Sequence, residues 1–297
     1  MSAPAAGVRP LAVVVLTQDE ERTLPDCLAS LERLDAAVWV VDSGSRDRTV
    51  EVARRAGCAV VHHPFETYAA QRNWAFDHLP IQSPWTLCLD ADERLTPELA
   101  DEIRAIVTGP GGDRRSAYMM SRRTIFMGRW IRHGGQYPTY HLRLFRTGRA
   151  RCEDRLYDQH FVAPGPVGRL RHDFIDVLTS DLTAWTTRHN RWASLEADQQ
   201  LHERSLPLTS PAPAAPMIEP RLLGDTIQRR RFWRTRVYRR APLFVRPWLL
   251  WVYAYVIRLG FLDGVPGLVF HTLQKFWFRF LIDAKIYEAK LRARRAP

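Results

Sequence analysis

The first hundred residues alternate short apolar segments with segments of helical periodicity. We expect strands in the apolar segments, which cover residues 11–16, 38–41, 59–61 and 85–89. Helices are expected between and after them, over residues 24–34, 47–56, 68–78 and 96–107. This repeated alternation predicts an α/β fold, with a mainly parallel sheet and helices on both of its faces.

Two of the expected strands end on an aspartate. Asp42 follows residues 38–41, and Asp90 follows residues 85–89. In sheets of this kind, ligands bind at the carboxyl ends of the strands. The run Asp90-Ala91-Asp92 sets two carboxylates two residues apart, and such oxygens can hold Mg²⁺ or Mn²⁺ against a diphosphate leaving group. The alternative is an acidic turn that caps the next helix.

Two more polar segments follow strands. Residues 41–49 (Val-Asp-Ser-Gly-Ser-Arg-Asp-Arg-Thr) offer Asp42 as an acceptor for the imide N–H of a uracil or for ribose hydroxyls. The alternative is an Asx turn, with Asp47 as the N-cap of the following helix. Residues 17–21 (Thr-Gln-Asp-Glu-Glu) are, taken alone, equally well an acidic first helical turn.

In this order and spacing, the segments resemble the family 2 glycosyltransferases. The resemblance is closest to the branch that includes the lipopolysaccharide or lipooligosaccharide core β-1,4-glucosyltransferases. The matching segments are 17–21, 41–49, 71–73 and 89–93, followed by 133–135, 143–146 and 258–264. The resemblance covers roughly residues 11–288, and it implies a GT-A (nucleotide-diphospho-sugar transferase) fold for the α/β domain.

The resemblance also implies roles for single residues. It assigns the nucleotide sugar, expected to be a UDP-sugar, to Thr17, Glu20, Asp42, Arg72, Asn73 and Asp90, and the cofactor, Mg²⁺ or Mn²⁺, to Asp92 and Asp90. The chain departs from the family pattern at two positions: Asp19 replaces the usual Asn, and Arg46 replaces a small Thr. Because a carboxylate at position 19 adds negative charge near the pocket, we leave Asp19 out of the binding set.

The catalytic base is expected in residues 152–158 (Cys-Glu-Asp-Arg-Leu-Tyr-Asp). Transfer with inversion needs a carboxylate near the acceptor hydroxyl, on the face opposite the leaving diphosphate. Glu153 and Asp158 match the two acidic positions of the family pattern, and Asp154 lies between them. The alternative is a salt-bridged acidic loop among Arg149, Arg151 and Arg155.

A basic stretch lies between two later strands, and it contains Arg122, Arg123, Arg129, Arg132 and His133. It would suit a phosphorylated, anionic acceptor such as a lipid A–core oligosaccharide. The alternative is a set of charge-paired loop arginines. The expected reaction moves a hexose, glucose by resemblance, to a hydroxyl of an envelope glycolipid.

Positive charge is concentrated at the end of the chain. The net charge is +11 overall, −2 for residues 1–220 and +13 for residues 221–297. We expect a catalytic domain over residues 1–204, a proline-rich linker over 205–220 and a basic, amphipathic helical region over 221–297. The four cysteines lie far apart, without a Cys-x-x-Cys pair, which favours a reducing cytoplasm.

The apolar runs of the basic region are too short or too interrupted to span a bilayer. Residues 248–257 are uncharged, but Arg258 follows, and residues 265–282 contain His271, Lys275 and Arg279. A basic segment rich in aromatic residues fits a helix that lies on an anionic membrane. We expect a peripheral or monotopic protein at the cytoplasmic face of the inner membrane. A helical subdomain packed on the catalytic domain is the alternative.

Three other functions remain open from the sequence. A polyprenyl-phosphate or exopolysaccharide glycosyltransferase would keep the reaction and change the acceptor. A non-catalytic carbohydrate- or polyanion-binding protein would use the same fold, although the Asp90/Asp92 pair argues against it. A nucleic-acid-binding protein would suit the pI near 10, but the acidic strand ends count against it, and we expect no nucleic-acid partner.

Overall fold

The computed structural model describes residues 8–109, 114–155, 159–178, 181–205, 218–224 and 226–295. The chain divides into two compact units. The sheet unit contains Met1–Arg122, Tyr140–Cys152 and His160–Val177, and the helical unit contains Arg123–Thr139, Glu153–Gln159 and Leu178–Pro297. The predicted segments divide the chain differently, because residues 182–205 cluster with the C-terminal helices. Most of the predicted linker, residues 206–217, lies outside the described residues.

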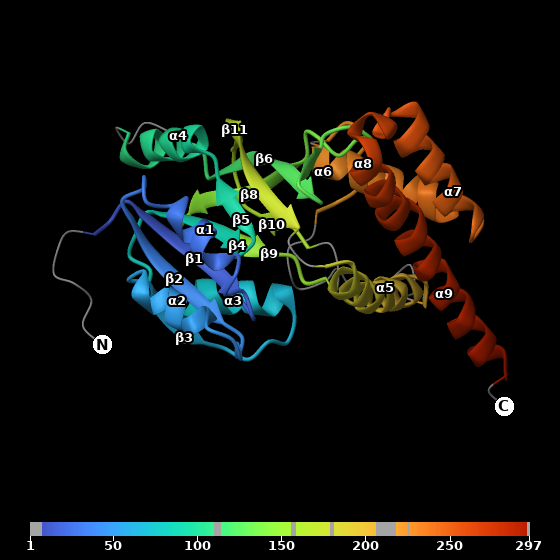
Figure 1. Ribbon diagram of the computed structural model, residues 1–297, viewed down its shortest axis with the longest axis horizontal. Helices are drawn as coiled ribbons and strands as arrows, with labels where there is room; N and C mark the ends of the chain where they lie inside the picture. The colour runs from blue at the N-terminus through green and yellow to red at the C-terminus, as the bar shows by residue number, and fades with distance from the viewer. Residues whose placement is uncertain are drawn as a thin grey trace. The chain divides into compact units, whose positions relative to one another are not determined.

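One half of the main sheet is parallel (Figure 1). Its strands occur in the order β3-β2-β1-β4, with β1 bonded on both sides. Strong β-formers fill these strands, and the central ones are mostly apolar because both faces are covered. The bounds are β1 (Leu11–Thr17), β2 (Ala36–Asp42), β3 (Ala59–His62) and β4 (Trp85–Asp90).

The other half of the sheet is antiparallel. The strand β8 pairs antiparallel with β4 and β6, β11 pairs antiparallel with β5, and the order along the sheet is β4-β8-β6-β11-β5. The α/β class and the parallel half of the sheet agree with the prediction. The antiparallel half makes the sheet as a whole mixed. The bounds are β5 (Glu93–Leu95), β6 (Ala117–Phe126), β8 (Tyr140–Arg146) and β11 (Val167–Leu178), with β7 (Arg129–Ile131) paired to the end of β6 and a separate pair of β9 (Arg151–Cys152) and β10 (Phe161–Val162).

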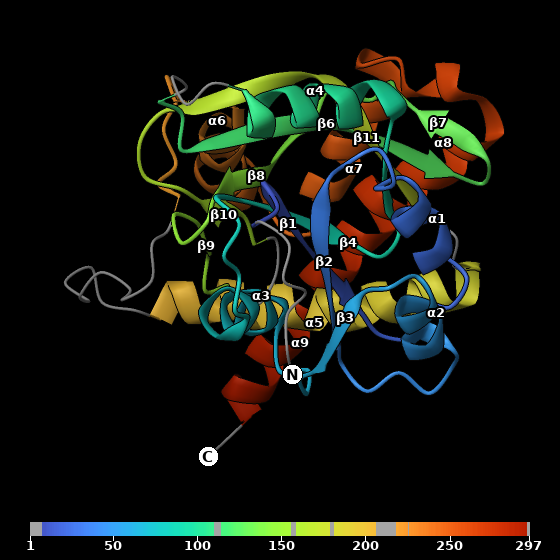
Figure 2. The same ribbon diagram turned by 90° about the vertical axis from the view of Figure 1, so that its left-hand side faces the viewer.

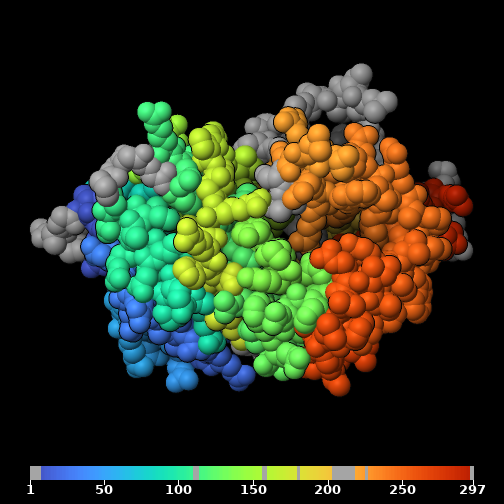
Figure 3. Space-filling view, turned by 90° about the horizontal axis from the view of Figure 1, so that it is seen from above, coloured from blue at the N-terminus to red at the C-terminus, as the bar shows by residue number. Residues whose placement is uncertain are grey.

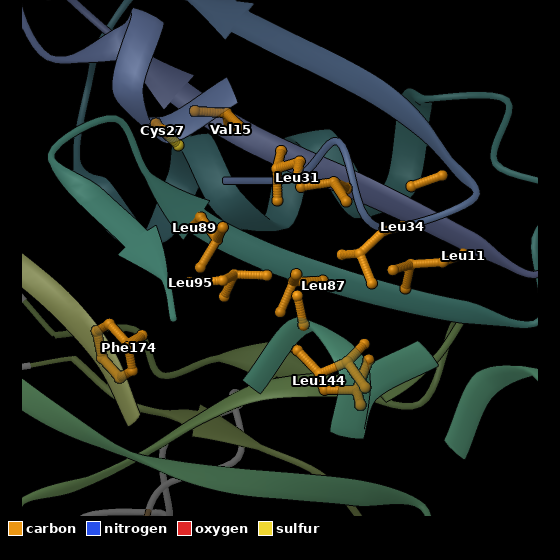
Figure 4. Packing of buried hydrophobic residues seen from close by; sticks show 14 of the residues in the cluster. Leu11, Val15, Cys27, Leu31, Leu34, Leu87, Leu89, Leu95, Leu144 and Phe174 are labelled. Atoms are coloured by element: carbon orange, nitrogen blue, oxygen red, sulfur yellow. The ribbon is translucent and has the colours of Figure 1, made fainter. Parts of the chain in front are cut away.

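Helices cover both faces of the sheet unit, and the side chains of β1 alternate between them. Leu11, Val13 and Val15 enter the larger apolar cluster, in which α4 lies along β6 and β11 (Figures 2 and 4). Val14 enters a smaller cluster with Ala75 of α3. The period-2 alternation of β1 therefore produces a three-layer core. The helices are α1 (Leu24–Ala29), α2 (Thr49–Arg55), α3 (Tyr68–His78) and α4 (Pro97–Thr108).

The helical unit has its own apolar core. Ala193 and Ala197 of α5 (Leu182–Ser205) pack against Phe278 and Ile282 of α9 (Phe278–Arg295). The small alanines allow the two helices to approach closely. The remaining elements are α6 (Thr226–Phe232), η1 (Trp233–Val237), η2 (Tyr238–Arg240), α7 (Val245–Val252), η3 (Tyr253–Ile257), η4 (Gly260–Asp263), α8 (Gly264–His271) and η5 (Thr272–Trp277).

Within the described residues, no single helix is long and apolar enough to cross a membrane. One pair of helical segments, Val245–Ile257 with Gly260–Arg294, has together the length and apolar composition of a membrane span, but the pair is bent by 70° between its two parts.

Candidate active site

The parallel strands bring the predicted polar side chains to one edge of the sheet. The β1–β2 register sets Thr17 opposite Asp42, and the β1–β4 register sets Leu16 opposite Asp90. The Thr17 hydroxyl donates to the Asp42 carboxylate at 3.2 Å, and both side chains are buried. Asp42 and Asp90 follow Thr17 by 25 and 73 residues in the sequence. All three lie at the carboxyl ends of the strands, where ligands of such sheets bind.

The Asp42 carboxylate is occupied by its own turn. One oxygen accepts the backbone N–H groups of Gly44 and Ser45, each at 2.9 Å, and the other accepts the hydroxyls of Thr17 and Ser45. Gly44 has φ = +86°, a conformation that favours glycine. This is the Asx turn that the sequence left open. A contact between Asp42 and a base stays a prediction, and it would have to share oxygens that already accept four hydrogen bonds.

The loops after β1 and β2 are bonded to each other. Asp19 has φ = +57°, and its carboxylate accepts the backbone N–H of Arg46 at 2.7 Å. Asn and Asp are the side chains that best tolerate this conformation, so Asp19 can replace the usual Asn. Asp47 accepts the N–H groups of Glu21 and Thr49 at 3.0 and 2.9 Å, and α2 begins at Thr49. The prediction of Asp47 as the N-cap was wrong by one position, because Arg48 is the N-cap; the Asp47 side chain still accepts the first helical N–H while it joins the two loops.

Glu20, a predicted nucleotide-sugar ligand, lies in the first of these loops. Its carboxylate accepts the Thr23 hydroxyl, and its backbone N–H donates to Thr49 Oγ1 at 2.7 Å. Glu20 is half-buried and is one of the carboxylates that act electrostatically on Asp92. It therefore belongs to the same acidic surroundings as the strand ends.

Two guanidinium groups hold Asp90. Arg72 donates to both Asp90 oxygens, at 2.9 and 3.2 Å, and Arg143 of β8 donates to Oδ2 at 2.9 Å. Burial would raise the pKa of the Asp90 carboxyl, but the two cations outweigh it and hold this pKa well below its usual range. Asp90 is therefore a carboxylate whose charge is already balanced, and a metal would compete there with two arginines.

Glu93 completes this network. Its carboxylate accepts a hydrogen bond from Arg143, and it also accepts the Asp90 backbone N–H at 3.0 Å. Burial raises the pKa of Glu93 to about 7, although Arg143 opposes the shift. Neither Glu93 nor Arg143 was predicted as a site residue. The segments 89–93 and 143–146 were noted as motifs, but only the antiparallel β4–β8 pairing shows that they meet.

Asp92 differs from Asp90 in its surroundings. No side chain of the described residues donates a hydrogen bond to the Asp92 carboxylate, while burial and the nearby carboxylates of Asp176 and Asp90 raise its pKa well above the usual value. Within the described residues, no three acidic, His or Cys side chains form a metal cluster. Mg²⁺ and Mn²⁺ often take only one or two carboxylates and complete their shell with water and substrate phosphates. The half-buried, uncompensated Asp92 oxygens fit such a cation.

Three consecutive residues of α3 hold three separate segments in place. Gln71 Nε2 donates to Ser43 Oγ at 3.0 Å in the loop after β2, and Arg72 binds Asp90. Asn73 donates to the Cys152 carbonyl at 3.0 Å and accepts the Cys152 N–H at 2.8 Å. Successive helical residues point about 100° apart, so one turn can reach all three segments. The resemblance assigns Asn73 to the nucleotide sugar, which stays a prediction, and the structure shows its side chain fixing the chain just before Glu153.

Glu153 is buried in an ion pair. Its two oxygens face the guanidinium of Arg231, with one nitrogen–oxygen distance of 2.8 Å, and one oxygen also accepts the Ile218 N–H at 2.7 Å. Glu153 is fully buried, and Arg231 is 4% exposed. This bidentate arrangement favours a structural role, and a catalytic role for Glu153 stays a prediction. Asp158, the other predicted base, lies outside the described residues.

The arginines of the predicted acceptor stretch have contacts within their own units. Arg122 pairs with Asp176 at 3.3 Å, and Arg123 and Arg132 lie over the ring of Trp130, at 4.9 and 5.1 Å from its centroid. Arg129 donates to the Leu262 carbonyl at 3.3 Å, and His133 bonds Asp263. These contacts match the alternative of partnered arginines at several positions, and an acceptor role stays a prediction.

Comparisons with known proteins identify the family of the chain. The glycosyl transferase family 2 model matches residues 12–175. The lipopolysaccharide core biosynthesis glycosyltransferase LpsC of Rhizobium meliloti (strain 1021) is 27% identical over 205 residues, covering 67% of this chain and 74% of LpsC. An uncharacterized glycosyltransferase of Rickettsia prowazekii, RP128, is 31% identical over 121 residues, and the match spans 41% of each chain.

Two solved structures match the chain over most of its length. Staphylococcus aureus TarS 1–349 in complex with UDP-GlcNAc matches with a TM-score of 0.45 and 12% identity, over 95% of this chain and 91% of that one. The mannosyltransferase PcManGT of Pyrobaculum calidifontis, in complex with GDP-Man and Mn²⁺, matches with a TM-score of 0.46 and 14% identity, over 99% and 91%. The chain has the predicted GT-A fold. Because the family model matches more than half of its residues, this protein belongs to glycosyl transferase family 2.

Proposed function

We propose that this family 2 glycosyltransferase moves a hexose, glucose by resemblance, from a UDP-sugar to a hydroxyl of an envelope glycolipid such as lipopolysaccharide core, with inversion at the anomeric carbon. The observation that carries the proposal is the pair of strand-end aspartates, Asp90 balanced by two arginines and Asp92 without a cationic partner. The similarity to LpsC, whose name gives a role in lipopolysaccharide core biosynthesis, supports the acceptor class.

The strand-end residues would bind and orient the donor. Asp92 would hold a divalent cation against the diphosphate, and the cation would supply charge stabilisation for the leaving UDP. Asp90 is anchored by Arg72 and Arg143, so its main effect is to fix the backbone that carries Asp92. Thr17 and Glu20 would line the base and ribose pocket beside the Asp42 turn.

The catalytic base would come from residues 153–158, which directly follow Cys152, the residue that Asn73 bonds. In this proposal the Asp158 carboxylate takes the proton of the acceptor hydroxyl as its oxygen attacks the anomeric carbon, opposite the leaving diphosphate. Glu153, whose oxygens face Arg231, would keep this segment in place rather than accept the proton.

We propose that the enzyme works at the cytoplasmic face of the inner membrane, as a peripheral or monotopic protein. The net charge of +13 on residues 221–297 supports this location, because an anionic leaflet attracts such a segment. An acceptor carried by the membrane would then be reached without leaving the surface.

The test is hydrolysis of a panel of nucleotide sugars by the purified chain, with Mn²⁺, Mg²⁺ or EDTA. We expect UDP-sugar hydrolysis that depends on the metal and is abolished by Asp92→Ala. The matched control is Asp101→Ala, because Asp101 is a half-buried carboxylate on α4 that pairs with the surface arginines Arg33 and Arg104. Normal metal-dependent hydrolysis by Asp92→Ala would remove the central claim. Analysis of the anomeric configuration of the product then tests inversion, and envelope glycolipids of a deletion strain test the acceptor.

A further inference from the structure

A continuous apolar face covers the outside of one bent helical segment. Over Val245–Ile257 and the start of Gly260–Arg294, large exposed apolar side chains recur at helical spacing. Exposure reaches 64% at Ile257 and 73% at Val265. The residues of this face, which we call the hairpin face, are Val245, Trp248, Leu249, Val252, Tyr253, Val256, Ile257, Leu259, Phe261, Leu262, Val265 and Leu268. The segment that carries them is drawn in orange tones in Figure 3.

The charges of this segment point away from the hairpin face. Asp263 is 1% exposed, and its carboxylate accepts the His133 backbone N–H at 2.9 Å and bonds the His133 ring at 2.6 Å. Arg246 is also 1% exposed and is held by Asp283. From 247 to 270, a fully described stretch, Arg258 is the one charged residue with an exposed side chain. A water-facing helix would carry its charges on the outside, so this segment has the opposite polarity.

Glycines close the inner side of the segment. A Cβ on Gly134 would lie 2.1 Å from the His271 ring, one on Gly260 would lie 2.8 Å from it, and one on Gly267 would lie 2.5 Å from Asp263. The segments 133–135 and 258–264, noted as motifs in the sequence, therefore build this packed inner side. The inner side is filled by these contacts, and the side chains of the hairpin face stay exposed on the outside of the segment, although Trp248 also touches Phe276.

Basic residues flank the hairpin face. Residues 226–262 contain nine arginines and no Asp or Glu. Several of these arginines form ion pairs with buried carboxylates, as Arg231 does with Glu153. Others are exposed: Arg229, Arg230, Arg236 and Arg240. An exposed apolar face of this length is rare on a water-soluble protein. Because the neighbouring residues are basic and include no Asp or Glu, the face fits an anionic lipid surface better than a second protein.

We propose that the hairpin face enters the acyl-chain layer of one leaflet of an anionic bilayer, with Arg258 at headgroup level. This inference rests on the proposed action at a membrane, and it specifies which residues insert. The first arm, Val245–Ile257, has 13 residues in α7 and η3 and is about 20 Å long. The hydrocarbon core is about 30 Å thick, so a segment bent by 70° reaches into one leaflet and does not cross.

Binding of the full chain to vesicles tests the inference. The vesicles contain phosphatidylglycerol and phosphatidylethanolamine, with phosphatidylcholine vesicles as the neutral comparison. We expect the protein to float with the anionic vesicles and to stay bound when salt is raised from about 0.1 M to about 1 M, because acyl contacts are not screened. Lipids brominated on their acyl chains should quench tryptophan fluorescence, and Trp248→Phe should reduce this quenching.

Two variants distinguish insertion of the hairpin face from nonspecific binding to vesicles. Leu249→Glu with Ile257→Glu should lower vesicle partitioning by at least about tenfold, because two charges would enter the acyl layer. The matched control is Val167→Glu, an exposed valine at the start of β11, which should bind like the wild type. Both variants change exposed side chains, and a thermal melt by circular dichroism checks that each is folded.

Other results would overturn the inference. Release of the wild type by salt without acyl quenching would mean that charge alone holds it, and wild-type binding by the double variant would mean that another surface inserts. Failure to bind together with a dimer in sedimentation would mean that a second copy covers the face. Hydrolysis of UDP-sugar in solution is measured on the same variants and should be unchanged. A chain that inserts without hydrolysing the donor would disprove the proposed transfer and leave the insertion intact.

Discussion

Replacing Asn73 with alanine should weaken the sheet unit by about 2–4 kcal/mol. The Asn73 amide makes two hydrogen bonds to the backbone of Cys152, at 3.0 and 2.8 Å, and Cys152 is 1% exposed. Loss of the amide takes one hydrogen bond from a buried N–H and one from a buried C=O, and an unmet buried group costs about 1–3 kcal/mol. Because Asn73 is itself only half-buried, water can replace part of the loss, which keeps the sum below the maximum.

Urea unfolding of the purified variant measures this loss, with Asn190→Ala as the control. Asn190 lies at an exposed position of α5, and its replacement should change stability by less than about 0.5 kcal/mol. Since Cys152 directly precedes Glu153, we also expect kcat for sugar transfer to fall more than donor hydrolysis. A change in unfolding free energy equal to that of Asn190→Ala would refute the reasoning, as would equal losses of transfer and hydrolysis.

Three further predictions follow from buried charges. Arg143→Met should destabilise the protein by about 3–5 kcal/mol in urea unfolding, because Asp90 and Glu93 lose a shared cation; a loss below about 1 kcal/mol would contradict the network. Glu153→Gln should lower stability and retain measurable transfer, whereas Asp158→Asn should remove transfer; the reverse pattern would make Glu153 the base. His271 is fully buried, neither ring nitrogen has a hydrogen-bond partner among the described residues, and burial lowers its pKa from 6.5 to about 4. The unfolded state then binds the extra proton, so stability should fall by about 3 kcal/mol as pH decreases from 6.5 towards 4; His271→Asn should flatten this part of the stability curve, and an unchanged curve would refute the assignment.

The sequence predicted the parallel half of the sheet because its signals are local. Apolar runs mark β1, β2 and β4, and α3 covers Tyr68–His78, as the helical pattern indicated. The predicted helix over residues 24–34 instead ends at Ala29. There the Ser30 hydroxyl donates to the Cys27 carbonyl at 2.6 Å and accepts the Leu95 N–H at 3.1 Å. This contact with β5 is a tertiary one, and helical periodicity carries no information about it.

The candidate site was predicted where it depends on strand ends and missed where it depends on distant pairing. Parallel strands bring Asp42 and Asp90 to one edge by topology alone. Arg143 reaches Asp90 from an antiparallel strand 53 residues later, and Arg231 reaches Glu153 from 78 residues away. When the two partners are so far apart in the sequence, many carboxylates could pair with a given arginine, and no sequence spacing predicts which one does.

The two aspartates of Asp90-Ala91-Asp92 are chemically different although the motif makes them look equivalent. Asp90 has two guanidiniums within 3.2 Å, whereas Asp92 faces Asp176, Asp90, Glu93 and Glu20. A folded protein tolerates such a cluster when a ligand brings the missing positive charge. The arginines also prevent the two carboxylates from acting together as one strongly binding pair. A cation held mainly by Asp92 would stay weakly bound until a diphosphate adds its oxygens, which would link metal binding to donor binding.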